Sequence, residues 1–177
     1  MLQPDRDDWS EGTAPEHLGR MRDAPAMRRC AMARDYDWGR YPEPVLGWVM
    51  AQKTVGLGTA LAVFFKGRPE RFNYLHKRNV PDEFCGATRL LDNICLRINS
   101  GFYLVMRHDD VADAQRVRKW LADQQLDRSA GCSGRWVLDE VIVGRLLNGA
   151  PLPQAHPRPR ASAPRLFSLD AWLPHTP

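Results

Sequence analysis

The chain has 177 residues, of which 44% are hydrophobic and 26% charged, and it carries a formal net charge of +4 and four cysteines. A chain of this length and composition can bury a sizeable core without disulfides, which excludes wholesale disorder. Residues 150–177 contribute three arginines against one aspartate, and elsewhere Lys and Arg alternate with Asp and Glu. Because nucleic-acid binding needs clustered basic side chains, this distribution argues against it.

Cysteine spacing and hydropathy indicate a reduced, non-membrane protein. Cys30, Cys85, Cys95 and Cys132 are too widely spaced for the close ligand pairs of a zinc site, so neither a metal nor another cofactor is expected. The first thirty residues lack the apolar core of a signal peptide. The longest apolar run, residues 57–65, is about half the length of a membrane span. The sequence therefore predicts a cytoplasmic protein.

The first part of the chain predicts two helices. Residues 1–12 are polar and expected to be flexible, with Trp9 as the one side chain there that could dock. Thr13 is expected to cap the first helix, because a proline and an acidic residue follow in its first turn. A second helix is expected up to about Tyr36, with one apolar face. Its side chains at helical spacing are Met27, Cys30, Ala31 and Arg34.

The middle of the chain predicts a turn and a central helix. Gly39 can adopt the left-handed conformation of a helix C-cap, and Pro42 prevents the helix from continuing. Residues 42–50 then predict a short helix. Residues 59–65 predict a helix that is apolar nearly all round, which places it in the middle of the domain.

The remaining segments predict further helices. Residues 102–106 are expected to form an extended linker or a helical turn, since a lone strand of this length is marginal. Val137 and Val141 are expected inside the broad buried face of the last helix. In chain order we expect a short helix over 69–75, a long amphipathic helix over 81–99, a helix capped by Asp109 and Asp110 and ending near Gln124, a loop over 127–134, and a helix over 135–147.

Together these elements predict an all-α fold, a compact bundle of about six to eight short helices over residues 13–149 with a proline-rich tail over 150–177. The tail holds seven of the 14 prolines, which favours extended, polyproline-like chain. One apolar cluster interrupts it, residues 166–173, with Phe167 and Trp172. Two interpretations stay open: the cluster folds back on its own domain, or it is a recognition peptide for another protein.

Motifs for catalysis are mostly missing. Gly56-Leu-Gly58 is typical of phosphate loops only if a lysine follows, and none does, so Gly58 or Thr59 is expected to cap the central helix instead. The carboxyl groups of two polar pairs, Asp82 with Glu83 and Asp92 with Asn93, would need to converge in space to act as acid and base. The histidines show no metal-ligand or nucleophile spacing, so structural or surface roles are expected for them.

Part of the chain resembles a bacterial family of unknown function. The turn Asp35-Tyr-Asp-Trp-Gly39 and the segment from Gly56 to Phe65, which contains Gly-Thr-Ala-Leu, resemble the bacterial domain of unknown function numbered 4274 over about residues 31–103. Asp37 stands where the family pattern has asparagine, and Gly39 follows the tryptophan sooner. The family has no assigned activity, and the resemblance implies a small accessory or toxin-neutralising protein.

The sequence thus favours a non-enzymatic bacterial protein that binds another protein, for example an immunity or accessory protein. Two alternatives are kept: a hydrolase or transferase whose site assembles only in three dimensions, and a small-molecule-binding helical domain. No catalytic residue is predicted and no oligomeric state is assigned. Because aromatic and arginine side chains dominate protein interfaces, the predicted partner-binding residues are Tyr36, Asp37, Trp38, Arg40, Tyr41, Phe167 and Trp172.

Overall fold

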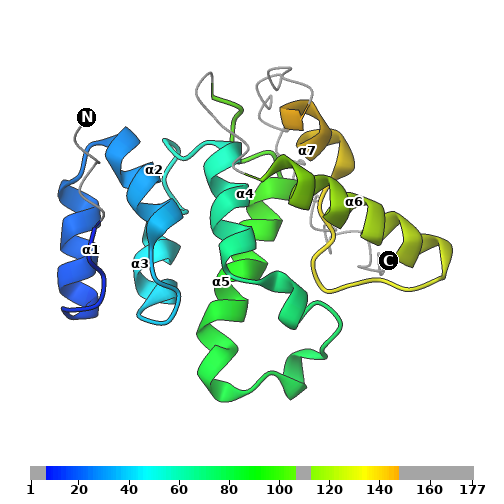
Figure 1. Cartoon of the computed structure of the whole chain (residues 1–177), viewed down its shortest axis with the longest axis horizontal. Coiled ribbons are helices and arrows are strands. Elements are labelled where there is room, and N and C mark those ends of the chain that lie inside the picture. Colours follow the sequence, from blue (N-terminus) through cyan, green and yellow to red (C-terminus); the bar gives the residue numbers. More distant parts are fainter. Residues whose placement is uncertain (1–6, 107–112, 148–177) are drawn as a thin grey trace, which may run out of the picture.

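The computed structural model describes residues 7–106 and 113–147. Within them seven α-helices and two short 3-10 helices pack around one core, and the chain runs across the molecule from α1 to α7 (Figure 1). The predicted all-α bundle is therefore confirmed, whereas the proline-rich tail lies outside the described residues. The helices are α1 Ala14–Asp23, α2 Ala26–Asp35, α3 Pro42–Val49, α4 Leu57–Lys66, η1 Pro69–Arg71, η2 Lys77–Asn79, α5 Asp82–Asn99, α6 Ala114–Ser129 and α7 Glu140–Leu147.

Helix α1 begins where the sequence predicts. The Glu16 carboxylate accepts hydrogen bonds from the Thr13 backbone N–H at 2.7 Å and from the Thr13 hydroxyl at 2.9 Å. These bonds satisfy a donor that the helix start leaves free, and they hold the pKa of Glu16 below its usual value. Ahead of the helix, Trp9 is buried in the core. The part of the N-terminal segment that the structure describes is therefore docked, against the expectation of a flexible end.

Helix α4 is the central helix, as predicted. Its side chains are buried nearly all round, and it packs against both α2 and α5 (Figure 1). The cap differs from the prediction, because the helix begins at Leu57 with Gly56 in an extended conformation before it. The backbone N–H of Leu57 donates instead to the carbonyl of Leu104 at 2.8 Å. Residues 102–106 thus form the predicted extended linker, joined to the start of α4 by one parallel β-bridge.

The predicted helix over 69–75 is wrong beyond its first turn. The helical geometry ends at Arg71, after Arg68 has entered the left-handed region with φ 51°. The reason is tertiary. Asn73 uses its side-chain oxygen to accept from the Trp136 backbone N–H at 3.0 Å and its backbone carbonyl to accept from the Arg135 N–H at 2.6 Å.

The predicted helix over 135–147 is also partly wrong. Residues 134–139 are extended, and only Glu140–Leu147 is helical. Trp136 and Leu138 are buried while Val137 between them is exposed, which is the alternation of an extended chain. Val141 is exposed as well, contrary to the predicted buried face.

Two side-chain amides hold this extended segment in place of a neighbouring strand. Gln124 of α6 accepts from the Leu138 backbone N–H at 3.1 Å and donates to the Leu138 carbonyl at 2.8 Å. Asn99 of α5 donates to the Val137 carbonyl at 2.7 Å and accepts from the Asp139 N–H at 2.8 Å. Buried backbone groups need such partners, so these amides replace the hydrogen bonds that a helix would have supplied.

Helix α6 is shifted relative to its prediction. Its cap is Asp113, whose carboxylate accepts from the Arg116 backbone N–H at 2.9 Å. Asp109 and Asp110, the predicted caps, lie outside the described residues. The helix continues to Ser129, into the predicted loop. Among the described residues, no helix combines the length and the apolar character needed to cross a bilayer.

Candidate functional site

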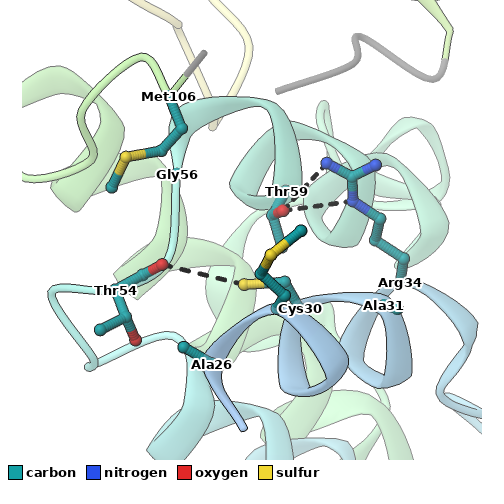
Figure 2. Close-up of a pocket in the computed structure, with 9 residues that line it drawn as sticks. Ala26, Cys30, Ala31, Arg34, Thr54, Gly56, Thr59 and Met106 are labelled. Carbon is teal, nitrogen blue, oxygen red and sulfur yellow. Dashed lines mark hydrogen bonds between the residues drawn. The ribbon is translucent and has the colours of Figure 1, made fainter. Parts of the chain in front are cut away.

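The candidate site is a groove between α2 and the start of α4, with a cavity volume of about 350 Å³. We call it the α2–α4 groove. Figure 2 shows that three segments far apart in the sequence form its walls. Its lining residues are Ala26, Met27, Cys30, Ala31 and Arg34 from α2, Thr54 and Gly56 from the connection to α4, Thr59 from α4, and Met106.

Helix α2 supplies one wall because it has two apolar faces. Met32 and Ala33 are buried in the core. Met27 lies on the other face, and Cys30 and Ala31 follow it there one helical turn later. Met27 is 77% exposed. The apolar face that the spacing predicts therefore exists, but it lines an open groove instead of the core.

The opposite wall is held by the extended segment that follows α5. Tyr103 is fully buried, and its hydroxyl donates to the Met50 carbonyl at 2.8 Å. Burial raises the pKa of Tyr103 to about 12. The next residue, Leu104, is held by a hydrogen bond from the Leu57 N–H to the Leu104 carbonyl. These anchors place Met106 at the groove, where its apolar side chain is partly exposed.

Among the described residues that line the groove, Arg34 is the charged one. Its Nε and Nη2 atoms donate to the hydroxyl oxygen of Thr59 at 3.2 Å and 3.0 Å, so the guanidinium is held across the groove from α2 to α4 (Figure 2). On the same wall the Cys30 thiol lies 3.9 Å from the Thr54 carbonyl oxygen. The groove is thus apolar along most of its length and cationic at one end.

This arrangement is suited to binding apolar groups. None of the described residues that line the α2–α4 groove is a carboxylate or a histidine, the groups that would serve there as acid and base. Within residues 7–106 and 113–147 no group of three His, Cys, Asp or Glu side chains could hold a metal ion. Comparison with protein-family models, curated proteins and solved structures finds no match to this chain. The geometry of the chain itself must therefore carry the functional argument.

The carboxylates singled out in the sequence are either paired with other side chains or exposed. Asp92 forms a two-point ion pair with Arg135 and accepts from the indole N–H of Trp136 at 2.9 Å. Asp82 and Glu83 lie exposed in the first turn of α5. The structure does not bring these carboxylates together in any of the pockets that it describes.

The aromatic turn, residues 36–41, was predicted as a partner-binding surface, and the structure builds part of it into the core. Tyr36 is fully buried, and its hydroxyl lies 2.9 Å from Nδ1 of the equally buried His17. Burial raises the pKa of Tyr36 to about 12. The Trp9 ring packs 4.9 Å from Tyr36, and the Tyr41 ring 5.5 Å from His17. Tyr36 therefore offers no side-chain surface to a partner in this structure.

The other predicted residues of the turn are partly or fully exposed, and each also makes a contact within the domain. The Asp37 carboxylate accepts from the Gly39 N–H at 2.8 Å, which closes the turn. Arg40 donates to the Ser10 carbonyl and ties the turn to the N-terminal segment. Trp38 is half-buried and packs over Gly67 at the end of α4. Phe167 and Trp172, the two remaining predicted residues, lie outside the described part of the chain.

A substitution of Gly67 tests the packing of Trp38. A Cβ atom at Gly67 would lie 2.5 Å from Cη2 of Trp38 and 2.9 Å from Cδ2 of Leu91, so one of these side chains must move. We expect Gly67→Ala to lower the free energy of unfolding by about 1–3 kcal/mol, the usual cost of overpacking, as measured by urea denaturation. Gly47→Ala in α3 is the matched control, because nothing lies within 4 Å of its Cβ position. A neutral Gly67→Ala would show that Trp38 does not pack there.

The sequence predicts the apolar face of α2 but not that this face lines a groove, because residue spacing does not show which face the core covers. The signal was present in α2, a helix of ten residues with apolar side chains on two faces. A short helix at the edge of a domain can bury only one of them. Met106 and Thr54 gave no comparable signal, since only the fold brings them to α2.

Proposed function

We propose that this protein binds another protein and that the α2–α4 groove receives apolar side chains of the partner. The observation that carries the proposal is the exposure of Met27, 77%, at the edge of an apolar cavity of about 350 Å³. Exposed apolar surface around a hollow marks interaction sites on monomeric proteins. Methionine suits such a site because its side chain is flexible and polarisable and adapts to differently shaped partners.

The proposed role is that of a non-enzymatic accessory or immunity protein in a bacterial cytoplasm. Binding is favoured over catalysis because, in the described part of the groove wall, the one charged side chain is Arg34, whose guanidinium bonds Thr59. An arginine in this position can orient a partner by pairing with a carboxylate at the rim of an interface.

Photo-crosslinking in cells of the source organism tests the proposal. With photoreactive p-benzoylphenylalanine in place of Met27, we expect the full chain to crosslink to one predominant protein through an apolar segment, identified by peptide mass spectrometry. The control places the same group at Leu126, which is 67% exposed on α6 and does not line the α2–α4 groove. Ala31→Glu adds a charge on the wall of the groove, and we expect it to reduce the specific crosslink roughly tenfold, the effect of losing one buried apolar contact.

Two outcomes contradict protein binding at the groove. In one, positions 27 and 126 capture the same proteins at similar yield. In the other, Ala31→Glu leaves the crosslink unchanged while circular dichroism shows that the variant is folded.

A second candidate function is binding of a small apolar molecule with an acidic group. The specific observation is the combination of a cavity large enough for such a ligand with one arginine at its end. A ligand that prefers the folded state must raise the melting temperature. We expect decanoate, as a probe, to raise it in the wild type and less in Arg34→Gln; equal shifts in both contradict this candidate.

A further inference from the structure

We propose that the chain's own segment 166–173 occupies the α2–α4 groove until a partner displaces it. This inference rests on the proposed function, because it names how the same site is regulated. It takes the first of the two interpretations that the sequence leaves open, in which the segment folds back on its own domain. The segment is Leu166-Phe-Ser-Leu-Asp-Ala-Trp-Leu173.

Chain length permits the contact. Helix α7 ends at Leu147, and the segment begins 19 residues later. A chain of that length spans up to about 60 Å when extended. A domain of this size has a radius of gyration of roughly 15 Å. The segment can therefore reach any face of the domain, and the composition of the groove and of the segment decides where it binds.

The apolar content of the segment matches the groove. A cavity of about 150 Å³ accommodates a benzene ring, so the 350 Å³ of the groove has room for more than one aromatic side chain. Phe167 and Trp172 are the only aromatic residues beyond position 147. The groove wall is built of methionine, cysteine and alanine side chains, and methionine sulfur makes favourable contacts with aromatic rings.

The charges of the segment and the groove indicate in which orientation the segment binds. Asp170 is the only charged residue of the segment, and Arg34 is the only charged one among the described residues that line the groove. We therefore expect the Asp170 carboxylate to lie at the Arg34 end, with the aromatic side chains along the apolar wall formed by Met27 and Cys30. A carboxylate paired with a guanidinium forms a directional, charge-assisted hydrogen bond, which sets one orientation of the segment.

Tethering makes this occupant competitive. A segment joined to its site by a flexible connection acts at an effective concentration in the millimolar range. A free partner at micromolar concentration must bind the groove far more tightly than the segment does in order to replace it. A substitution that weakens the binding of the segment to the groove should therefore increase the binding of the partner.

The test uses full-length protein with p-benzoylphenylalanine in place of Met27, irradiated in dilute solution without any partner. We expect a monomeric product in which position 27 is joined to a residue of 166–173. The double substitution Phe167→Ser with Trp172→Ser should reduce that product roughly tenfold or more, because it removes both aromatic side chains. Position 126 is the control site, and His175→Ser, outside the segment, is the control variant.

Charge reversal gives an independent measurement. Asp170→Arg alone and Arg34→Glu alone should each lower the yield of the product, and the two together should restore part of it. The inference is overturned if position 27 reaches no residue of 166–173, if the aromatic double variant crosslinks as well as the wild type, or if the product is a dimer, in which case the occupant is a second copy.

The same variants separate this inference from the proposed function. In cells, the Phe167 and Trp172 double variant should capture roughly tenfold more partner than the wild type through position 27, as expected when a tethered competitor is removed. A cis crosslink with no partner captured even by this variant supports the inference and contradicts the proposed function. If the wild type and the Phe167 and Trp172 double variant capture the same amount of partner and no cis crosslink forms, the proposed function is supported and this inference is contradicted.

Discussion

Asp92→Asn is expected to lower the free energy of unfolding by about 2–4 kcal/mol at neutral pH, as measured by urea denaturation. In the native protein the carboxylate oxygens of Asp92 accept from Nε and Nη2 of Arg135 at 2.9 Å and 2.8 Å. The Arg135 side chain is only 10% exposed and that of Asp92 30%. The asparagine keeps an acceptor for Trp136 but leaves the guanidinium without a counter-charge. The estimate lies toward the low side of the range for buried pairs because Asp92 is partly solvated.

This loss should depend on pH. Partial burial raises the pKa of Asp92, but the hydrogen bonds from Arg135 and Trp136 and the charges of Arg135 and Lys77 outweigh it, so the pKa lies below its usual value. A carboxyl with a lowered pKa in the folded state stabilises the fold above its unfolded pKa of about 4, and this contribution is lost as the pH falls below that value. The difference between the wild type and Asp92→Asn should therefore be constant above about pH 5 and shrink in more acidic solution.

Two further variants make the measurement specific to the buried pair. Asp123→Asn removes a carboxylate that pairs with Lys119 across one turn of α6 at the surface, so it should cost about 0.5 kcal/mol or less. Adding Arg135→Met to Asp92→Asn removes the orphaned charge and should recover part of the stability. Equal costs for the Asp92 and Asp123 variants would show that the Arg135 pair is not buried in solution.

Phe64→Ala is expected to cost about 3–5 kcal/mol, the usual result of removing a buried aromatic ring and leaving a cavity. Phe64 is fully buried in α4. The centroid of its ring lies 5.9 Å from that of Trp120 in α6 and 6.2 Å from that of Trp136 in segment 134–139, and both ring pairs are edge to face. One side chain thus joins the central helix to the C-terminal third of the domain, and such ring pairs add to simple burial.

The measurement is again the free energy of unfolding in urea. Phe64→Leu keeps much of the volume and should lose less than half as much, which remains measurable if the alanine variant does not fold. Leu126→Ala, at a side chain that is 67% exposed, is the surface control and should change stability by about 0.5 kcal/mol or less. A Phe64→Ala variant as stable as this control would mean that α4 does not form the centre of the core.

Most helices could be predicted because their signals are local. The capping carboxylate of Glu16, the apolar run of α4 and the helical spacing in α5 act within a few residues of one another, and the structure confirms all three helices. The errors that the tertiary contacts explain fall on residues 72–75 and 135–139, where hydrogen bonds join groups far apart in the sequence. An amide such as Gln124 does not reveal in the sequence which backbone it will hold.

The candidate site could be predicted only in part. The apolar face of α2 was identified, but its exposure depends on which of two faces the neighbouring helices cover. The aromatic turn was ranked as a surface because its residues are polar and aromatic. In the structure its first ring, Tyr36, completes a buried cluster with Trp9 and His17. Both errors concern packing partners, which propensity does not specify.

The sequence by itself determined that this chain forms a helical domain around an apolar central helix, since helix caps, spacing and hydropathy act over short distances. Only the tertiary structure decided which apolar surfaces are left over. Met27 lies on an open groove. Met106 comes to face this groove because α2, α4 and the segment after α5 meet there (Figure 2). The physical reason is that burial is a property of the assembled core, in which each element can cover only a limited part of its neighbours' apolar area.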